Sequence, residues 1–539
     1  MMSVCLGACA TASAPAPATR VASQPLQLPE GVHLDVTHLL NRAAFGPSPA
    51  DVERVQRLGV AGWLEEQLAP GVDAQVEHRL SGFKTLKLSV AQAYEAYPPP
   101  KQRLKELGID PATVKDDAAM KEKLKELRKE DKDTLPRELI IEATQAKLIR
   151  VIQSQRQLEE VLVDFWFNHF NVSAEKGRTR WMVTAFEREA IRPHVLGKFR
   201  ELLGATAKHP AMLMYLDNWQ SVRDGFEPRA KLKEAAAAKL PHGLNENYAR
   251  ELLELHTLGV DAGYTQADVR EAARALTGWS LERAKSGEFG QFTFRAQAHY
   301  TGAKRIFGLE LPAGGTQSDG EALLDFVARH PATAHHLALQ LCQRFVGDEP
   351  PAALVDRVAA EFLRTDGDLR ATVRIIFESR EFWSPEAMAS KTKTPLEFVA
   401  SAVRAVGHLD EVQQPLAQVL ERMGMPQYRC GPPTGYSDLA RPWVSAGALV
   451  TRINFGLQLA AGRVRGVDVA LPAPSMAADA TIDAVSMRVL GRLPSAQTRG
   501  IIEHALHARA EELGDEQSPT ANPQLIAGLL LGSPEFQKQ

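Results

Sequence analysis

The chain has 539 residues, of which 44% are hydrophobic and 24% charged, and its 63 basic and 66 acidic residues give a formal net charge of −3. These values are typical of a folded globular protein and exclude a disordered or fibrous chain. The balanced charge leaves no electrostatic signature of nucleic-acid binding. No stretch contains the roughly 18 consecutive apolar residues of a membrane-spanning helix. The length predicts two or three packed sub-regions.

Residues 1–30 carry the clearest signal of location. Leu6-Gly7-Ala8-Cys9 resembles the lipobox of bacterial lipoproteins, in which the cysteine becomes lipidated, and the Pro/Ala/Ser/Thr-rich residues that follow are typical of a tether. Only five residues precede Leu6, fewer than a signal peptide needs, so we expect the signal to be encoded upstream of Met1. A chance match in a disordered N-terminus is the alternative. The prediction is an exported protein, periplasmic or at the cell surface, anchored through lipid on Cys9, with Ala10 favouring the outer membrane.

The next segments, 33–69 and 84–135, differ in character. Residues 33–69 predict a helical hairpin, whose second helix starts at Ser48-Pro49. Residues 84–135 place mixed-sign charges at i,i+4 spacing after three consecutive prolines, which is typical of a solvated helix or a flexible arm. We expect a solvent-exposed insertion here rather than a docking arm.

A buried helix is predicted within the helical stretch that runs from residue 135 to about 239. The segment VLVDFWFNHFNVS, residues 161–173, is apolar nearly all round. Asp164 and Asn168 are four residues apart and share one face of this helix. Buried polar groups need partners, so the two side chains either hold the structure together or form the floor of a pocket.

A polar stripe follows one side of the predicted helix at 245–258. At 100° per residue its five members lie within an arc of about 140°: Glu246, Asn247, Arg250, Glu251 and Glu254. Carboxylates in different environments can perform acid–base catalysis, and Arg250 could create that difference. The alternative is a solvated face with i,i+4 ion pairs. The two interpretations stay open on spacing alone.

The rest of the chain predicts further helices and one strand pair. Thr265 caps another helix, and residues 278–297 alternate apolar and polar side chains around a Gly-containing turn, which predicts a β-hairpin. Helices return over 317–407, and the Pro/Gly-rich, aromatic residues 424–447 predict a long ordered loop of the kind that borders sites. The expected fold is therefore mainly α, a multi-helix globular, bundle-like array with one small β-hairpin. The expected domains are the tether (1–30), the main helical domain (31–470) and a C-terminal helical unit (471–539).

Several of these segments together resemble a known family. The segments HLLNRAAFGPSPADVE, FWFNHFNVS, HPAMLMYLDNWQS, HPATAHHLALQLCQRFV and above all GLNENYARELLELHTLGVDAGYTQADVREAARALTGW resemble the domain-of-unknown-function 1800 family of bacteria, from about residue 34 to about 537. The resemblance implies an exported, largely helical protein and no particular reaction. It also implies a possible secreted sulfatase-like partner, because such genes commonly neighbour those of this family.

The predicted site joins the polar stripe to other polar segments and to the 424–447 loop. Its candidate catalytic residues are Glu246, Arg250, Glu251, His299 and Asp164, and its candidate binding residues are Asn168, Asp217, Asn218, Asn245, Asn247 and Trp279. His299 is equally well explained as a turn residue. No hydrolase, zinc or nucleotide motif occurs, so the sequence identifies no cofactor and no metal site. Two functions remain: an envelope enzyme acting on a glycan or similar substrate, or a non-catalytic envelope scaffold that binds a partner.

Overall fold

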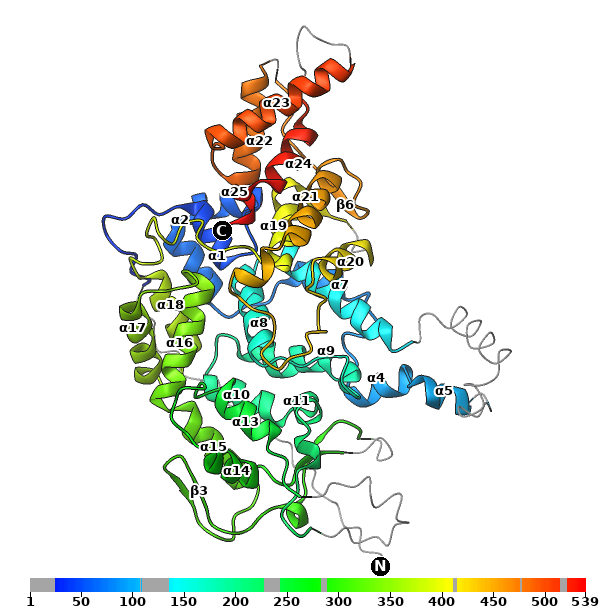
Figure 1. Cartoon of the computed structure of the whole chain (residues 1–539), viewed down its shortest axis with the longest axis vertical. Helices are drawn as coiled ribbons and strands as arrows, with labels where there is room; N and C mark the ends of the chain where they lie inside the picture. The colour runs from blue at the N-terminus through cyan, green and yellow to red at the C-terminus, as the bar shows by residue number, and fades with distance from the viewer. Residues whose placement is uncertain are drawn as a thin grey trace, which may run out of the picture.

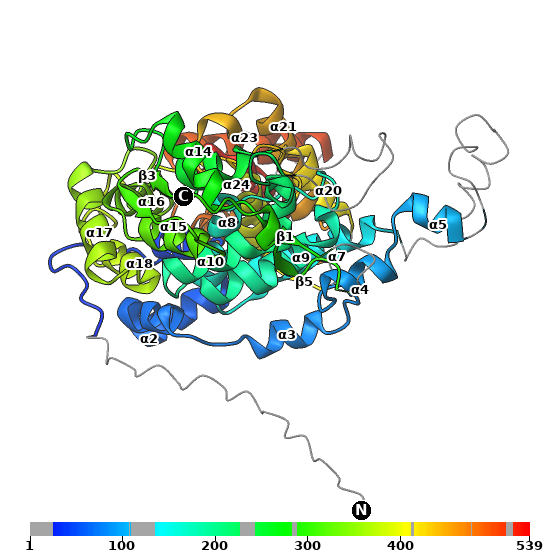
Figure 2. The same cartoon turned by 90° about the horizontal axis from the view of Figure 1, so that it is seen from below.

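The computed structural model confirms a mainly α-helical fold and describes residues 25–106, 108, 135–226, 243–282, 288–410, 414–475, 477–513 and 521–539. The predicted tether, Cys9 and most of the charged segment 101–133 lie outside these residues. The N-terminal helices are α1 (Val36–Ala43), α2 (Pro49–Leu68), α3 (Ala74–Leu80), α4 (Val90–Ala96) and α5 (Pro100–Glu106). Figure 2 shows α2, α3 and α4 following one another along one side of the molecule.

The middle of the chain supplies most of the helices. They are α7 (Arg137–Gln153), α8 (Gln157–His169), η3 (Thr179–Trp181), α9 (Val183–Ala185), the π-helical turn η4 (Phe186–Ile191), η5 (Arg192–His194), α10 (Phe199–Lys208), α11 (Pro210–Tyr215), η6 (Asn218–Gln220), α13 (Asn247–Glu254), α14 (Gln266–Ala275), η7 (Ala296–Ala298), α15 (Ser318–Ala328), α16 (Pro331–Phe345), α17 (Ala352–Arg364) and α18 (Leu369–Phe377). The C-terminal part contains α19 (Pro395–Val406), α20 (Gln414–Arg422), η8 (Arg441–Trp443), α21 (Ala446–Ala460), α22 (Ala478–Leu490), α23 (Ala496–Leu513), α24 (Pro523–Gly532) and α25 (Pro534–Gln537).

The predicted hairpin is present, with β1 (Trp279–Leu281) antiparallel to β2 (Phe292–Phe294). The described residues contain two further two-stranded antiparallel sheets, β3 (Lys304–Ile306) with β4 (Leu309–Leu311), and β5 (Gly407–Leu409) with β6 (Val467–Val469). The β5–β6 pair joins strands about 60 residues apart, and this separation left no local hairpin pattern in the sequence.

The helix α19 lies at the centre of the fold, and every one of its residues is buried. Figure 1 shows α7, α8 and α19 between the C-terminal helices α22–α24 at one end and α14, α15 and β3 at the other. The N-terminus of α19 is fixed by a capping box between Thr394 and Glu397, with Pro395 in the first turn. The charged side chain of Arg404 is satisfied inside the core by Asp51 and by backbone carbonyls.

One hydrophobic core runs from Leu26 to Phe536. It includes the C-terminal helices, because α21 and α24 cross closely at small residues: a Cβ added to Gly456 would lie 2.9 Å from the Cβ of Leu531. Residues 471–539 therefore share the main core. Near the N-terminal helices, α4 contributes Ala93 to a small second cluster with Trp181, so the start of the charged 84–135 segment packs against the protein.

Candidate functional site

The N-terminus of α13 is built onto a strained turn at the end of α11. Asp217 has a φ of 62°, which is uncommon for a residue other than glycine. Three side chains hold the turn in place: the Asn245 amide donates to the Asp217 carbonyl at 3.4 Å, the Asn247 amide donates to the Leu216 carbonyl at 3.2 Å, and the Lys176 ammonium lies 2.7 Å from the Asp217 carboxylate. Asn245 and Asn247 thus position the turn that carries Asp217.

The predicted stripe on α13 divides into two parts. Glu246 and Arg250 turn outward and form a network with α14, in which the Glu246 carboxylate lies 3.6 Å from Arg250 and 3.4 Å from Arg270, and Arg250 donates to Gln266 at 2.7 Å. The side chain of Arg250 is 40% exposed. These two residues therefore form the solvated face that the sequence left open as an alternative.

Glu251 has different surroundings. It is half-buried, and its carboxylate makes no hydrogen bond or ion pair with any described residue. Burial and the charge of Glu254 raise the pKa of Glu251, against the opposite effect of Arg250. Burial and the charges of Glu254 and Glu251 raise the pKa of the Tyr264 hydroxyl, against the opposite effect of Arg250. Two carboxylates three residues apart on one helix thus share a face, and neither makes a hydrogen bond or ion pair with a described residue.

Tyr215, at the end of α11, binds the predicted 424–447 loop through a hydrogen bond. Its hydroxyl donates to the Gly431 carbonyl, and burial, Cys430 and Glu251 raise its pKa to about 12. The Asn171 amide donates to the Cys430 carbonyl at 3.1 Å and to the Pro432 carbonyl at 2.7 Å. We call Asn171, Tyr215, Asp217, Glu251 and Cys430 the Tyr215 cluster. It joins α8, α11, α13 and the loop.

The loop is seated on the end of α8 through Asn168. Its backbone amide at Tyr436 donates to the Asn168 Oδ1 at 3.3 Å. At Gly435 the φ is 69°, and an added Cβ would lie 2.4 Å from the Asn168 carbonyl oxygen, so the contact requires glycine. Asn168 therefore fixes the loop beside the Tyr215 cluster.

Asp164 has a separate role in the core. Its carboxylate pairs with Lys147 at 2.7 Å, and the Lys147 ammonium also lies over the rings of Phe167 and Tyr428. Burial opposes the charge on Lys147, but Asp164 and Glu187 outweigh it and raise the lysine pKa. Because each charge has its partner, this pair stabilises the packing of α7 against α8.

Asn218, Trp279 and His299 lie around β1, and Asn218 directly follows Asp217 of the Tyr215 cluster. The Asn218 amide donates to the Leu276 and Trp279 carbonyls at 3.2 and 3.0 Å. The Trp279 ring is fully buried against Gly320. His299 contacts the Thr277 carbonyl at 2.8 Å and the Asp319 carboxylate at 3.2 Å. The Asn218 amide and the His299 ring are thus engaged with the protein, whereas the buried indole N–H of Trp279 has no hydrogen-bond partner among the described residues.

Histidines gather in two places among the described residues, and one of these groups has the geometry to hold a metal ion. His408, Asp410 and Asp468 place their ligand atoms within 4.8 Å of one another, and all three are exposed. The sequence did not reveal them because His408 and Asp468 meet across the β5–β6 pair. The other group is buried: His169 contacts Gln340 at 2.9 Å and the His256 carbonyl at 3.1 Å. Its nitrogens are used by protein groups, and burial lowers its pKa to about 4.

The fold and these contacts define a mainly α-helical protein with a polar cluster where three helices and a long loop meet, a class that does not itself imply a reaction. Among the described residues, no helix is both long and apolar enough to cross a membrane. A protein-family comparison matches residues 38–538 to the family described as "Protein of unknown function (DUF1800)", so the chain belongs to this family. No curated protein and no solved structure matches the chain.

Proposed function

We propose that this chain is an exported lipoprotein that performs acid–base chemistry on an extracytoplasmic glycan or a similar hydroxyl-rich substrate, with Glu251 as the proton donor. The observation that carries the proposal is the state of Glu251: a half-buried carboxyl with a raised pKa and no described partner. A general acid must hold its proton near the working pH, and a neighbouring carboxylate in a partly apolar setting is the usual way to achieve this.

Glu254 supplies the second carboxylate of this site. Cleavage of a glycosidic bond uses a pair of carboxyl groups, one that protonates the leaving oxygen and one that remains charged to activate water or form the covalent intermediate. In this assignment Glu251 protonates the leaving oxygen, and Glu254 is the carboxylate that activates water or forms the covalent intermediate.

The test compares two glutamates of the same helix. Wild-type protein, Glu251→Gln and Glu246→Gln are incubated with peptidoglycan and with a panel of envelope polysaccharides, and the release of reducing ends is measured. Loss of the general acid should lower the rate by about 10²–10⁴-fold. Glu246→Gln is the matched control and should keep the rate, because Glu246 faces α14. A Glu251→Gln variant with the wild-type rate would refute the assignment.

A non-catalytic scaffold is the second candidate, and one surface favours it. On α21 and α23, large apolar side chains are exposed: Leu449, Val450, Ile453 and Ile501. They adjoin a groove of about 200 Å³ between α21, α23 and α24. Exposed apolar groups of this kind are typical of protein-binding surfaces. The partner for this candidate is the secreted sulfatase-like protein, and Ile453→Asp with Ile501→Asp should abolish co-purification with it.

A further inference from the structure

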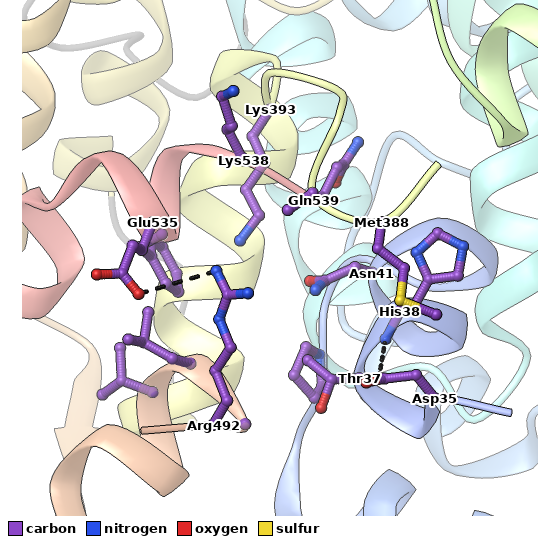
Figure 3. Close-up of a pocket in the computed structure, with 16 residues that line it drawn as sticks. Asp35, Thr37, His38, Asn41, Met388, Lys393, Arg492, Glu535, Lys538 and Gln539 are labelled. Atoms are coloured by element: carbon purple, nitrogen blue, oxygen red, sulfur yellow. Dashed lines mark hydrogen bonds and ion pairs between the residues drawn. The ribbon is translucent and has the colours of Figure 1, made fainter. Parts of the chain in front are cut away.

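A cavity lies between α1, the segment that precedes α19, and the C-terminal residues. It has a volume of about 100 Å³, and its walls include Thr37, Asn41, Met388, Lys393, Phe536 and Gln539. The volume exceeds the roughly 10–15 Å³ that one water molecule requires on this scale, so the cavity has room for a small organic molecule. Figure 3 shows the Lys393 side chain running into it, whereas the exposed Lys538 points away.

Two buried lysines, Lys391 and Lys393, lie just before α19 in the chain, and they differ in how their charges are satisfied. Lys391 is 1% exposed, and its ammonium lies 2.7 Å from the Asp348 carboxylate and 2.9 Å from the Asp438 carbonyl. Lys393 is 2% exposed, yet its ammonium makes no hydrogen bond or ion pair within the described ranges; it lies 3.8 Å from the centre of the Phe536 ring. A buried charge without a counter-ion is costly.

The side chains that line the cavity carry one positive charge in excess, because three are basic (Lys393, Arg492 and Lys538) and two are acidic (Asp35 and Glu535). At its edge, Arg492 lies 3.8 Å from Glu535, and the exposed Lys538 and the capping residue Asp35 carry one charge of each sign. Deeper inside, the Glu397 carboxylate is occupied by Arg344 and Gln539, and Arg452 donates to Gln537 and to the Lys393 carbonyl. Burial lowers the pKa of His38 to about 4, so its ring is neutral. Among the lining cations, the buried one without an acidic partner is Lys393.

We propose that this cavity binds a small organic carboxylate, whose carboxylate pairs with the Lys393 ammonium and whose short apolar chain packs against Phe536 and Met388. A monoanion matches the single unmatched charge. The Asn41 amide and the Thr37 hydroxyl are placed along the same wall to hydrogen-bond such a ligand. A phosphate dianion would need several more buried donors than this cavity offers.

The chemistry also predicts how binding depends on pH. Burial, with a further contribution from Arg452 and against the pull of Glu397, lowers the pKa of Lys393 to about 7. The ligand binds the protonated amine, so affinity should fall as the pH rises above neutral. By linkage, a bound carboxylate should raise the pKa of the Lys393 amine.

Calorimetric titration of the full chain with sodium butyrate and with its neutral isostere butyramide tests the proposal. We expect butyrate to bind at least about tenfold more tightly than butyramide, the equivalent of about 1.4 kcal/mol. Lys393→Met should abolish butyrate binding, and the matched control Lys538→Met should leave it unchanged. Equal affinities for the two ligands, or unchanged binding by Lys393→Met, would overturn the proposal.

A measurement on the wild-type protein keeps the proposal testable if Lys393→Met folds poorly. The ε-amine of Lys393 is followed by NMR in isotope-labelled protein while the pH is varied, with and without butyrate. An upward shift of its titration midpoint on adding butyrate supports the carboxylate pair. A midpoint that does not respond to butyrate contradicts it, and neither outcome depends on the activity proposed for Glu251.

Discussion

Replacement of Lys393 by methionine should stabilise the folded chain to an extent that depends on pH. Burial lowers the pKa of this lysine from 10.5 to about 7. Below pH 7 the folded and unfolded chains both hold the proton, so the full cost of the buried charge is present. Between these two pKa values the unfolded chain holds a proton that the folded chain has released, and stability therefore rises with pH until the cost is gone.

The size of this stabilisation follows from the difference between the two pKa values of Lys393. At about 1.4 kcal/mol per pH unit, the difference between 10.5 and about 7 corresponds to about 5 kcal/mol. Urea denaturation of the wild type and of Lys393→Met, measured near pH 6 and near pH 10, should show a gain of up to about 5 kcal/mol at the lower pH and little at the higher. A gain that is absent, or equal at both pH values, would refute the reasoning.

Lys391 provides a control of opposite sign. It lies two residues away and is equally buried, but its ammonium pairs with Asp348 at 2.7 Å. Lys391→Met leaves a carboxylate and a carbonyl without their partner and should destabilise the fold by about 3 kcal/mol. If both substitutions stabilised the protein, the charges of Lys391 and Lys393 would not differ in their pairing.

Three further predictions concern the polar stripe, the loop and the N-terminus. Glu246→Gln and Arg250→Met should change stability by only about 0–1 kcal/mol, because their pairs are exposed. Glu251→Gln should be neutral or stabilising in thermal unfolding, since it removes an unpartnered carboxyl. A large loss of stability in any of the three variants would show buried pairing instead. Gly435→Ala should cost about 2–4 kcal/mol, since the φ is positive and the added Cβ meets a backbone carbonyl of α8, and a melting temperature equal to wild type would contradict the contact. Cys9→Ser, expressed with a signal sequence, should release the protein from membranes into the soluble fraction; unchanged fractionation argues against lipidation.

Local patterns predicted the elements whose stability is local. The helix capped by Thr265, the buried helix around Asp164 and the hairpin at 278–297 all form, because caps, apolar periodicity and turn residues act over a few positions. The helix predicted over 245–258 ends earlier, at Glu254, because the His256 amide donates to the Glu251 carbonyl and the Thr257 hydroxyl to the Leu252 carbonyl.

The site depended on contacts that no local pattern contains. Glu246 and Glu251 belong to one stripe in the sequence and are both half-buried, and the contacts with α14 give Glu246 partners that Glu251 lacks among the described residues. The same limit applies to Lys391 and Lys393, which look alike in the sequence. The partner of Lys391, Asp348, lies more than 40 residues away in the chain, and Lys393 has no hydrogen-bond or ion-pair partner among the described residues. Burial and pairing are properties of the tertiary fold.

The pKa of the Glu251 carboxyl tests the central claim most directly, since it requires no knowledge of the substrate. Carbon NMR of the labelled side chain, assigned by comparison with Glu251→Gln, gives its titration midpoint in the wild type and in Glu254→Gln. We expect a midpoint above the ordinary value of a glutamate in the wild type, and a lower one once the neighbouring charge of Glu254 is removed. An ordinary midpoint in the wild-type protein would contradict the assignment of Glu251 as the proton donor.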